Sequence, residues 1–185
     1  MPTEVLEMIL RIKYFCIVVF SISLIACEKE KVKTKTSYDI YNSYTINHKA
    51  SFFNVPPGIV SIFLDQSQKG NAELKDLLID VNELSFLIIN KHKNERKDCA
   101  YLRELNSKLD SLNFYDLAQI NNSKESILVK VDKKKKYFNE LVVLVSNVDA
   151  VYCISFKGKI NSKKVVNLVR PENVVAVTNL DRFKQ

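Results

Sequence analysis

The sequence has no tryptophan, three glycines, two histidines and no pair of cysteines in CxxC spacing. The three glycines, at positions 58, 70 and 158, are too far apart for a GxGxxG or GxxxxGK[ST] loop, so no phosphate-binding motif for a nucleotide is present. Without CxxC spacing, a cysteine zinc site is not indicated. We therefore predict no cofactor and no metal.

The two histidines do not belong to a recognisable catalytic constellation. His48 lies in a polar segment, and His92 stands between two lysines that disfavour its protonated form. Carboxylates can carry out acid–base chemistry without histidine, but their spacing singles out no pair around the expected core elements. These acids are Asp76, Asp80, Glu83 and Asp116. The sequence thus favours a non-catalytic binding or scaffold module, with an envelope hydrolase of glycan or peptide as the alternative.

What the chain does have is one apolar run, residues 14–26, preceded by Arg11 and Lys13 and followed at once by Cys27 and charged residues. A positive flank, a short apolar segment and a small residue before the cut are the parts of an export signal. The run is shorter than the roughly 20 apolar residues that span a bilayer. We predict a cleaved signal peptide over residues 1–26, the alternative being an uncleaved membrane helix.

The residues Leu24-Ile25-Ala26-Cys27 resemble the lipobox of bacterial lipoproteins. There the cysteine sulfur takes a diacylglyceryl group and the new amine an acyl chain such as palmitate, and several chains together give a stable anchor. Cys27 is therefore the predicted lipidation site. We expect a cell-envelope protein on the outer membrane or on the periplasmic face of the inner membrane. Because Glu4 and Glu7 are unusual in such a leader, Met8 is the expected start of translation.

After Cys27 the sequence suggests a flexible tether over residues 27–50 and one domain over residues 51–185. The tether assignment depends on a polar composition without apolar periodicity. In the domain we expect an antiparallel sheet with helices packed on it, an α+β fold. A central strand covers residues 84–89, and four further strands form a meander over residues 114–120, 126–131, 138–145 and 151–156. Helices are expected after Pro56, over residues 74–81, over residues 99–112 and near Val165.

The chain carries a formal net charge of +7, and its lysines include a run of four between two expected strands. This run is Lys133, Lys134, Lys135 and Lys136. A charged hairpin turn keeps a sheet solvated, and it is also a candidate contact for a partner or an anionic surface. Nucleic-acid binding would require that export fails, and the lysines are not interleaved with aromatic side chains.

Two further cysteines, Cys99 and Cys153, fall on an expected helix and an expected strand. A disulfide between them is possible in an oxidising envelope, but Cys99 also fits the apolar stripe of its helix.

Several blocks of the sequence resemble the small bacterial lipoproteins of the family known as domain of unknown function 4252, best known from the Bacteroidetes. The blocks are Pro56-Pro57-Gly58-Ile59, residues 73–89, residues 112–117, residues 139–144 and the ending from Val151 to Val169. The resemblance implies an envelope protein with an α+β fold, often lipid-anchored, and brings no enzymatic activity or functional residue with it. Asp110-Ser111-Leu112 also looks like a short O-glycosylation acceptor pattern of that phylum.

Overall fold

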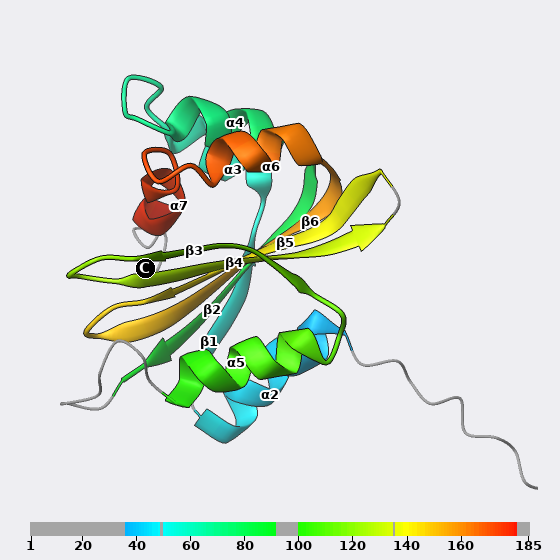
Figure 1. Cartoon of the computed structure of the whole chain (residues 1–185), viewed down its shortest axis with the longest axis vertical. Coiled ribbons are helices and arrows are strands. Elements are labelled where there is room, and N and C mark those ends of the chain that lie inside the picture. Colours follow the sequence, from blue (N-terminus) through cyan, green and yellow to red (C-terminus); the bar gives the residue numbers. More distant parts are fainter. Residues whose placement is uncertain (1–35, 49, 92–99, 135, 181–185) are drawn as a thin grey trace, which may run out of the picture. The chain divides into compact units, whose positions relative to one another are not determined.

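The computed structural model describes residues 36–48, 50–91, 100–134 and 136–180 (Figure 1). The helices are α2 (Ser37–His48), α3 (Pro57–Phe63), α4 (Asn71–Leu78), α5 (Ala100–Asp110), α6 (Ser162–Leu168) and α7 (Val175–Thr178). The strands are β1 (Ser51–Val55), β2 (Val81–Asn90), β3 (Tyr115–Asn121), β4 (Ser126–Lys134), β5 (Tyr137–Ser146) and β6 (Ala150–Asn161). Within these described ranges, no helix is both long and apolar enough to cross a membrane.

The strands form one antiparallel sheet in the order β1-β2-β6-β5-β4-β3. Strands β3 to β6 are consecutive neighbours, which confirms the predicted meander and the α+β class. The predicted central strand is β2, which lies between β1 and β6. Its apolar run is covered on both faces, because Phe86 and Ile88 belong to one core cluster and Leu87 and Ile89 to the other.

Helices cover both faces of this sheet, as Figure 1 shows. On one face, α3, α4, α6 and α7 bury side chains such as Leu77, Val165 and Val177 against the sheet. On the other face, α2 and α5 bury Tyr41, Leu105 and neighbouring apolar residues. The buried apolar side chains of these helices fall into two clusters, one on each face of the sheet, so the domain has two cores separated by the strands.

The expectation of a flexible tether over residues 27–50 is wrong for its second half, because residues 37–48 form α2. Ile40, Tyr41 and Tyr44 of this helix are buried. Its sequence is rich in serine, threonine, asparagine and tyrosine, which are weak helix formers, so packing on the sheet stabilises it more than propensity does. The folded unit therefore includes α2, and residues 27–35 lie outside the described residues.

Two glycines mark places where backbones approach closely. Gly70, just before α4, has a φ of 80°, a conformation that favours glycine. Gly158 lies inside β6, which continues through it to Asn161, and it does not have a positive φ. The reason for glycine there is space, since a Cβ at Gly158 would lie 2.1 Å from the carbonyl oxygen of Asp80.

Candidate ligand-binding site

A pocket of about 320 Å³ lies between α2 and the C-terminal end of α5. Its lining consists of Asp39, Ile40, Ser43, Asn47, Lys108, Ser111 and Leu112. Five of these side chains are polar, and the two apolar ones also contribute to the core cluster between the helices and the sheet. The lining is therefore mostly polar, more so than in most small-molecule sites, and its two apolar side chains connect it to the core.

The α2 wall of the pocket follows helical spacing. Asp39, Ser43 and Asn47 stand at i, i+4 and i+8, so they lie along one side of the helix over about 12 Å. The helix start is fixed by a reciprocal cap: the Asp39 carboxylate accepts a hydrogen bond from Thr36 N at 2.8 Å, and Asp39 N–H donates to Thr36 Oγ1 at 3.4 Å. The Ser43 hydroxyl donates to the Ile40 carbonyl at 2.6 Å, which leaves its lone pairs to accept from a ligand.

The α5 wall provides a positively charged group. Lys108 Nζ lies 2.7 Å from the Glu104 carboxylate and 4.6 Å from the centre of the Tyr44 ring, so it is held between the two helices. This contact lowers the pKa of Glu104, chiefly through the hydrogen bond from Lys108. The Ser111 hydroxyl donates to the Lys108 carbonyl at 2.6 Å. Lys108 and Ser111 thus present an ammonium and a hydroxyl from the last turn of the helix.

The end of α5 is shaped by Asn113, which has a φ of 63°. Its N–H donates to the Asp110 carbonyl at 2.9 Å, and Phe114 N–H donates to the Leu109 carbonyl at 3.2 Å. These two bonds, with Phe114 and Leu109 buried in the same core cluster, form a Schellman motif. The motif stops the helix beside the pocket and directs the chain into β3.

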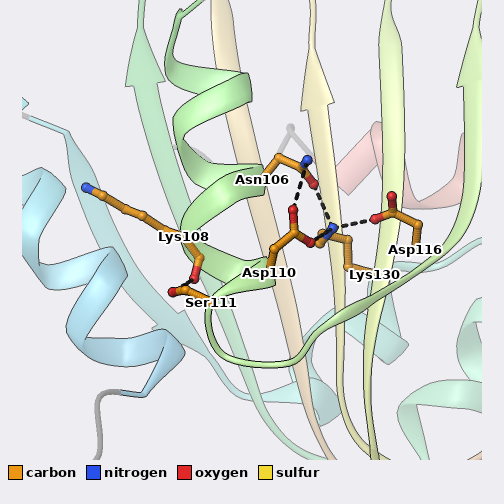
Figure 2. A network of polar contacts seen from close by, with 6 residues as sticks. All are labelled: Asn106, Lys108, Asp110, Ser111, Asp116 and Lys130. Carbon is orange, nitrogen blue, oxygen red and sulfur yellow. Dashed lines mark hydrogen bonds and ion pairs between the residues drawn. The ribbon is translucent and has the colours of Figure 1, made fainter.

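A buried lysine then ties this end of the helix to the sheet (Figure 2). Lys130 Nζ on β4 donates to Asn106 Oδ1 and Asp110 Oδ1, each at 2.7 Å, and also to Asp116 Oδ1 on β3. The Lys130 side chain is 0% exposed, whereas those of Asp110 and Asp116 are 51% and 62% exposed. In Figure 2, Lys108 and Ser111 point away from this network, on the side of α5 that faces α2. The network therefore fixes the turn from which the pocket side chains project.

A second buried network holds the start of α2. The Glu140 carboxylate on β5 accepts from Ser37 Oγ at 2.7 Å, Ser155 Oγ at 2.5 Å and Tyr41 Oη at 3.3 Å. Burial raises the pKa of Glu140 above its usual 4.5, while the hydrogen bonds from Ser155 and Ser37 oppose that rise. Burial also raises the pKa values of Tyr41 and of the nearby Cys153 thiol, so both stay protonated.

The four scattered acids singled out in the sequence do not converge on one site. Asp76 and Asp80 both pair with Lys164, at 3.2 and 3.0 Å. Glu83 lies 4.0 Å from Lys157, and Asp116 belongs to the Lys130 network. Asp39 is the one carboxylate among the described residues that line the pocket, so this pocket does not supply the pair that the hydrolase alternative requires. Among the described residues no group of histidine, cysteine and carboxylate side chains has metal-site geometry.

The other predicted site residues are only partly placed. Cys27, Cys99, His92 and Lys135 lie outside the described residues. Lys133 and Lys134 end β4, and Lys136 is exposed directly before β5. Cys153 is a free, buried thiol, as expected of a small apolar residue. His48 packs against the rings of Tyr44 and Tyr101, with centroids 5.1 and 5.3 Å away.

Sequence reasoning missed the pocket because half of it was assigned to the tether. A usable signal was present: a threonine three residues before an acid, Thr36 and Asp39, is the pattern of a capping box. Lys130 and Glu140 were missed because each looks like an ordinary polar residue of a strand, and nothing in the sequence says that it points into a core.

The family model described as "Domain of unknown function (DUF4252)" matches residues 44–168. The matched range begins within α2 and ends with α6, so it includes the whole sheet and the α5 wall of the pocket. No curated protein and no solved structure matches the chain.

Proposed function

Because the chain belongs to the DUF4252 family, whose description assigns no activity, we propose a function from the geometry alone: a lipid-anchored, non-catalytic binding module of the cell envelope. Its ligand occupies the pocket between α2 and α5. Cys27 carries the anchor, and the segment up to Thr36 joins it to the folded domain. The support for the anchor is the sequence from Leu24 to Cys27 with its export signal.

The observation that carries the binding proposal is the pocket itself. Its volume of about 320 Å³ falls at the lower end of the range for small-ligand sites, roughly 300–1,000 Å³. The walls offer one carboxylate, one ammonium, one amide and two hydroxyls. The lining has one negative, one positive and three neutral polar side chains. Such a balanced lining favours a small neutral or zwitterionic ligand with several hydrogen-bonding groups over a polyanion.

The positions of these groups are set before any ligand arrives. The Thr36–Asp39 cap fixes the start of α2, and the Lys130 network fixes the last turn of α5. Because both helix ends are fixed, binding does not have to order the backbone of the pocket walls, which favours affinity. The support is therefore strongest for recognition, since the described residues that line the pocket include neither a histidine nor a second carboxylate to act as an acid–base partner.

The test compares two variants on the same helix. Asn47→Trp fills the pocket, whereas Asn42→Trp places the same side chain at an exposed position of α2 that does not line it. The probes are free amino acids and dipeptides, and the readout is the thermal midpoint of unfolding. A ligand at about 100 times its Kd stabilises the folded state by roughly 2.7 kcal/mol.

We expect at least one probe to raise the midpoint of the wild type and of Asn42→Trp but not that of Asn47→Trp. Equal stabilisation of both variants would place binding elsewhere on the domain. If no probe class stabilises the wild type, the pocket is not a site for the ligands we propose.

A further inference from the structure

The end of the sheet at the β4–β5 turn carries exposed positive charge from two segments. Lys136 and Lys159 are both exposed, and Lys159 Nζ lies 4.5 Å from the centre of the Tyr137 ring. Tyr137 itself is 39% exposed. In the part of the chain that the structure describes, neither lysine makes an ion pair with a carboxylate. We call these three residues, Lys136, Tyr137 and Lys159, the basic tip.

The strand register places the backbones of two further lysines at the same end of the sheet. Lys133 pairs with Phe138 and Lys134 with Tyr137, while Tyr137 pairs on its other side with Asn161 of β6. The β3–β4 turn, with exposed Lys124, lies at the opposite end of β4. The backbones of Lys133 and Lys134 thus lie where β4 ends, beside the start of β5.

The folded domain also starts at this end of the sheet. Ser37, the first residue of α2, donates to Glu140, which is three residues from Tyr137 along β5. Three strand residues span about 10 Å. In Figure 1, the blue start of α2 and the yellow ends of β4 and β5 all lie on the right of the view.

The length of chain before Thr36 limits how far this end can be from an anchor at Cys27. The two positions are nine steps apart along the chain, and a fully extended chain covers at most about 3.6 Å per residue, or roughly 30 Å. A basic surface tethered so closely to a membrane has a high effective concentration there, so weak contacts suffice.

From this juxtaposition we infer that the basic tip docks on the anionic headgroups of the membrane that holds the anchor, and so orients the domain. The inference rests on the proposed anchor at Cys27. Lysine ammonium groups bind phosphate-bearing headgroups by charge, and tyrosine is well suited to the boundary between water and lipid. Each lysine near an anionic membrane surface increases the occupancy of the docked state about fivefold, and this attraction weakens as salt screens the charges.

The experiment uses the mature protein purified from membranes and reconstituted into two kinds of vesicle, phosphatidylcholine alone and equal parts phosphatidylcholine and phosphatidylglycerol. A water-soluble amine-acylating reagent labels exposed lysines, and peptide mass spectrometry measures the extent at each position. Lys124, at the far end of the sheet, is the internal control. The matched variants are Lys136→Gln/Lys159→Gln and Lys69→Gln/Lys124→Gln, which remove the same charge at different exposed positions.

We expect slower labelling of Lys136 and Lys159, but not of Lys124, in the vesicles with phosphatidylglycerol. Raising the salt from about 0.1 M to about 1 M, where the screening length falls from about 10 Å to about 3 Å, should abolish this protection. A cysteine-specific label at Tyr137→Cys should report the same protection. In this background, Lys136→Gln/Lys159→Gln should lower the occupancy of the membrane-docked state about 25-fold. Lys69→Gln/Lys124→Gln should leave that occupancy unchanged.

Equal labelling in the two vesicles, protection of Lys124 instead, or the same protection by inorganic phosphate without vesicles would overturn the inference. The mass of the N-terminal peptide from the same preparation separates this result from failure of the anchor. If Cys27 is unmodified, the anchor proposal fails, and the chain is then sedimented with each vesicle. Binding to phosphatidylglycerol vesicles that needs Lys136 and Lys159 would still support the basic tip, and binding to neither would refute it.

Discussion

Replacing Lys130 by methionine removes the ammonium group at the centre of the network in Figure 2 and keeps a side chain of similar length. The ammonium is fully buried, so the wild-type protein bears its desolvation cost, several kcal/mol, and offsets it with three acceptors. Once Lys130 is gone, Asp110 and Asp116 are not trapped, because their side chains are 51% and 62% exposed and return to water.

The reverse perturbation is more severe. The double variant Asp110→Asn/Asp116→Asn leaves the buried ammonium with neutral acceptors only. Breaking a buried pair in this way costs about 3–5 kcal/mol. For Lys130→Met, lost charge-assisted hydrogen bonds at roughly 1.5–3 kcal/mol each are partly offset by relief of desolvation, so we expect a net loss of about 1–2 kcal/mol.

The assay is urea unfolding at pH 7, read as the midpoint with an unchanged m-value. Lys108→Met is the control, since its ion pair with Glu104 is partly exposed and such pairs contribute about 1 kcal/mol or less. The predicted order of destabilisation is the double asparagine variant, then Lys130→Met, then Lys108→Met. If Lys130→Met proved more damaging than the double variant, the reasoning from exposure would be refuted.

Three further predictions test other parts of the structure. The pKa of Glu140 is raised in the folded state, so its contribution to stability is complete below pH 4.5 and is lost as pH rises through the native pKa. Urea midpoints measured across pH should show this loss in the wild type and not in Glu140→Gln. Asn113→Val should lower the free energy of unfolding by about 1–2 kcal/mol because a β-branched residue is strained at φ 63°, whereas Asn113→Gly should stay within about 0.5 kcal/mol of the wild type. Equal losses in the two variants would exclude the Schellman motif as the cause. Gly158→Ala should destabilise the protein by about 3 kcal/mol or more, because the new methyl group meets the Asp80 backbone. Gly58→Ala, whose methyl group meets nothing within 4 Å, should stabilise α3 by about 0.5–1 kcal/mol. Equal losses of stability in thermal unfolding of the two variants would contradict the packing argument.

The sheet could be predicted because its strands carry strong local signals. The run from Phe86 to Ile89 indicates a strand covered on both faces, and the polar turns between β3 and β6 indicate a meander. The leucine stripe of α5, with Leu102, Leu105 and Leu109 buried, is equally explicit.

The site could not be predicted to the same extent, since it depends on tertiary contacts that leave little local pattern. α2 has three core side chains among polar residues with weak helix propensity, so composition alone resembles a linker. The roles of Lys130 and Glu140 follow from cross-strand register and helix placement, which a single strand sequence does not encode. The lysine run was found easily, but its position beside the start of the domain required the sheet order.

The account as a whole depends on the anchor, and the most direct test is the intact mass of the N-terminal peptide of the native protein. The proposal predicts a peptide that begins at Cys27, carries a diacylglyceryl group and lacks residues 1–26. A peptide that retains the leader and has an unmodified Cys27 would contradict a lipid-anchored envelope module.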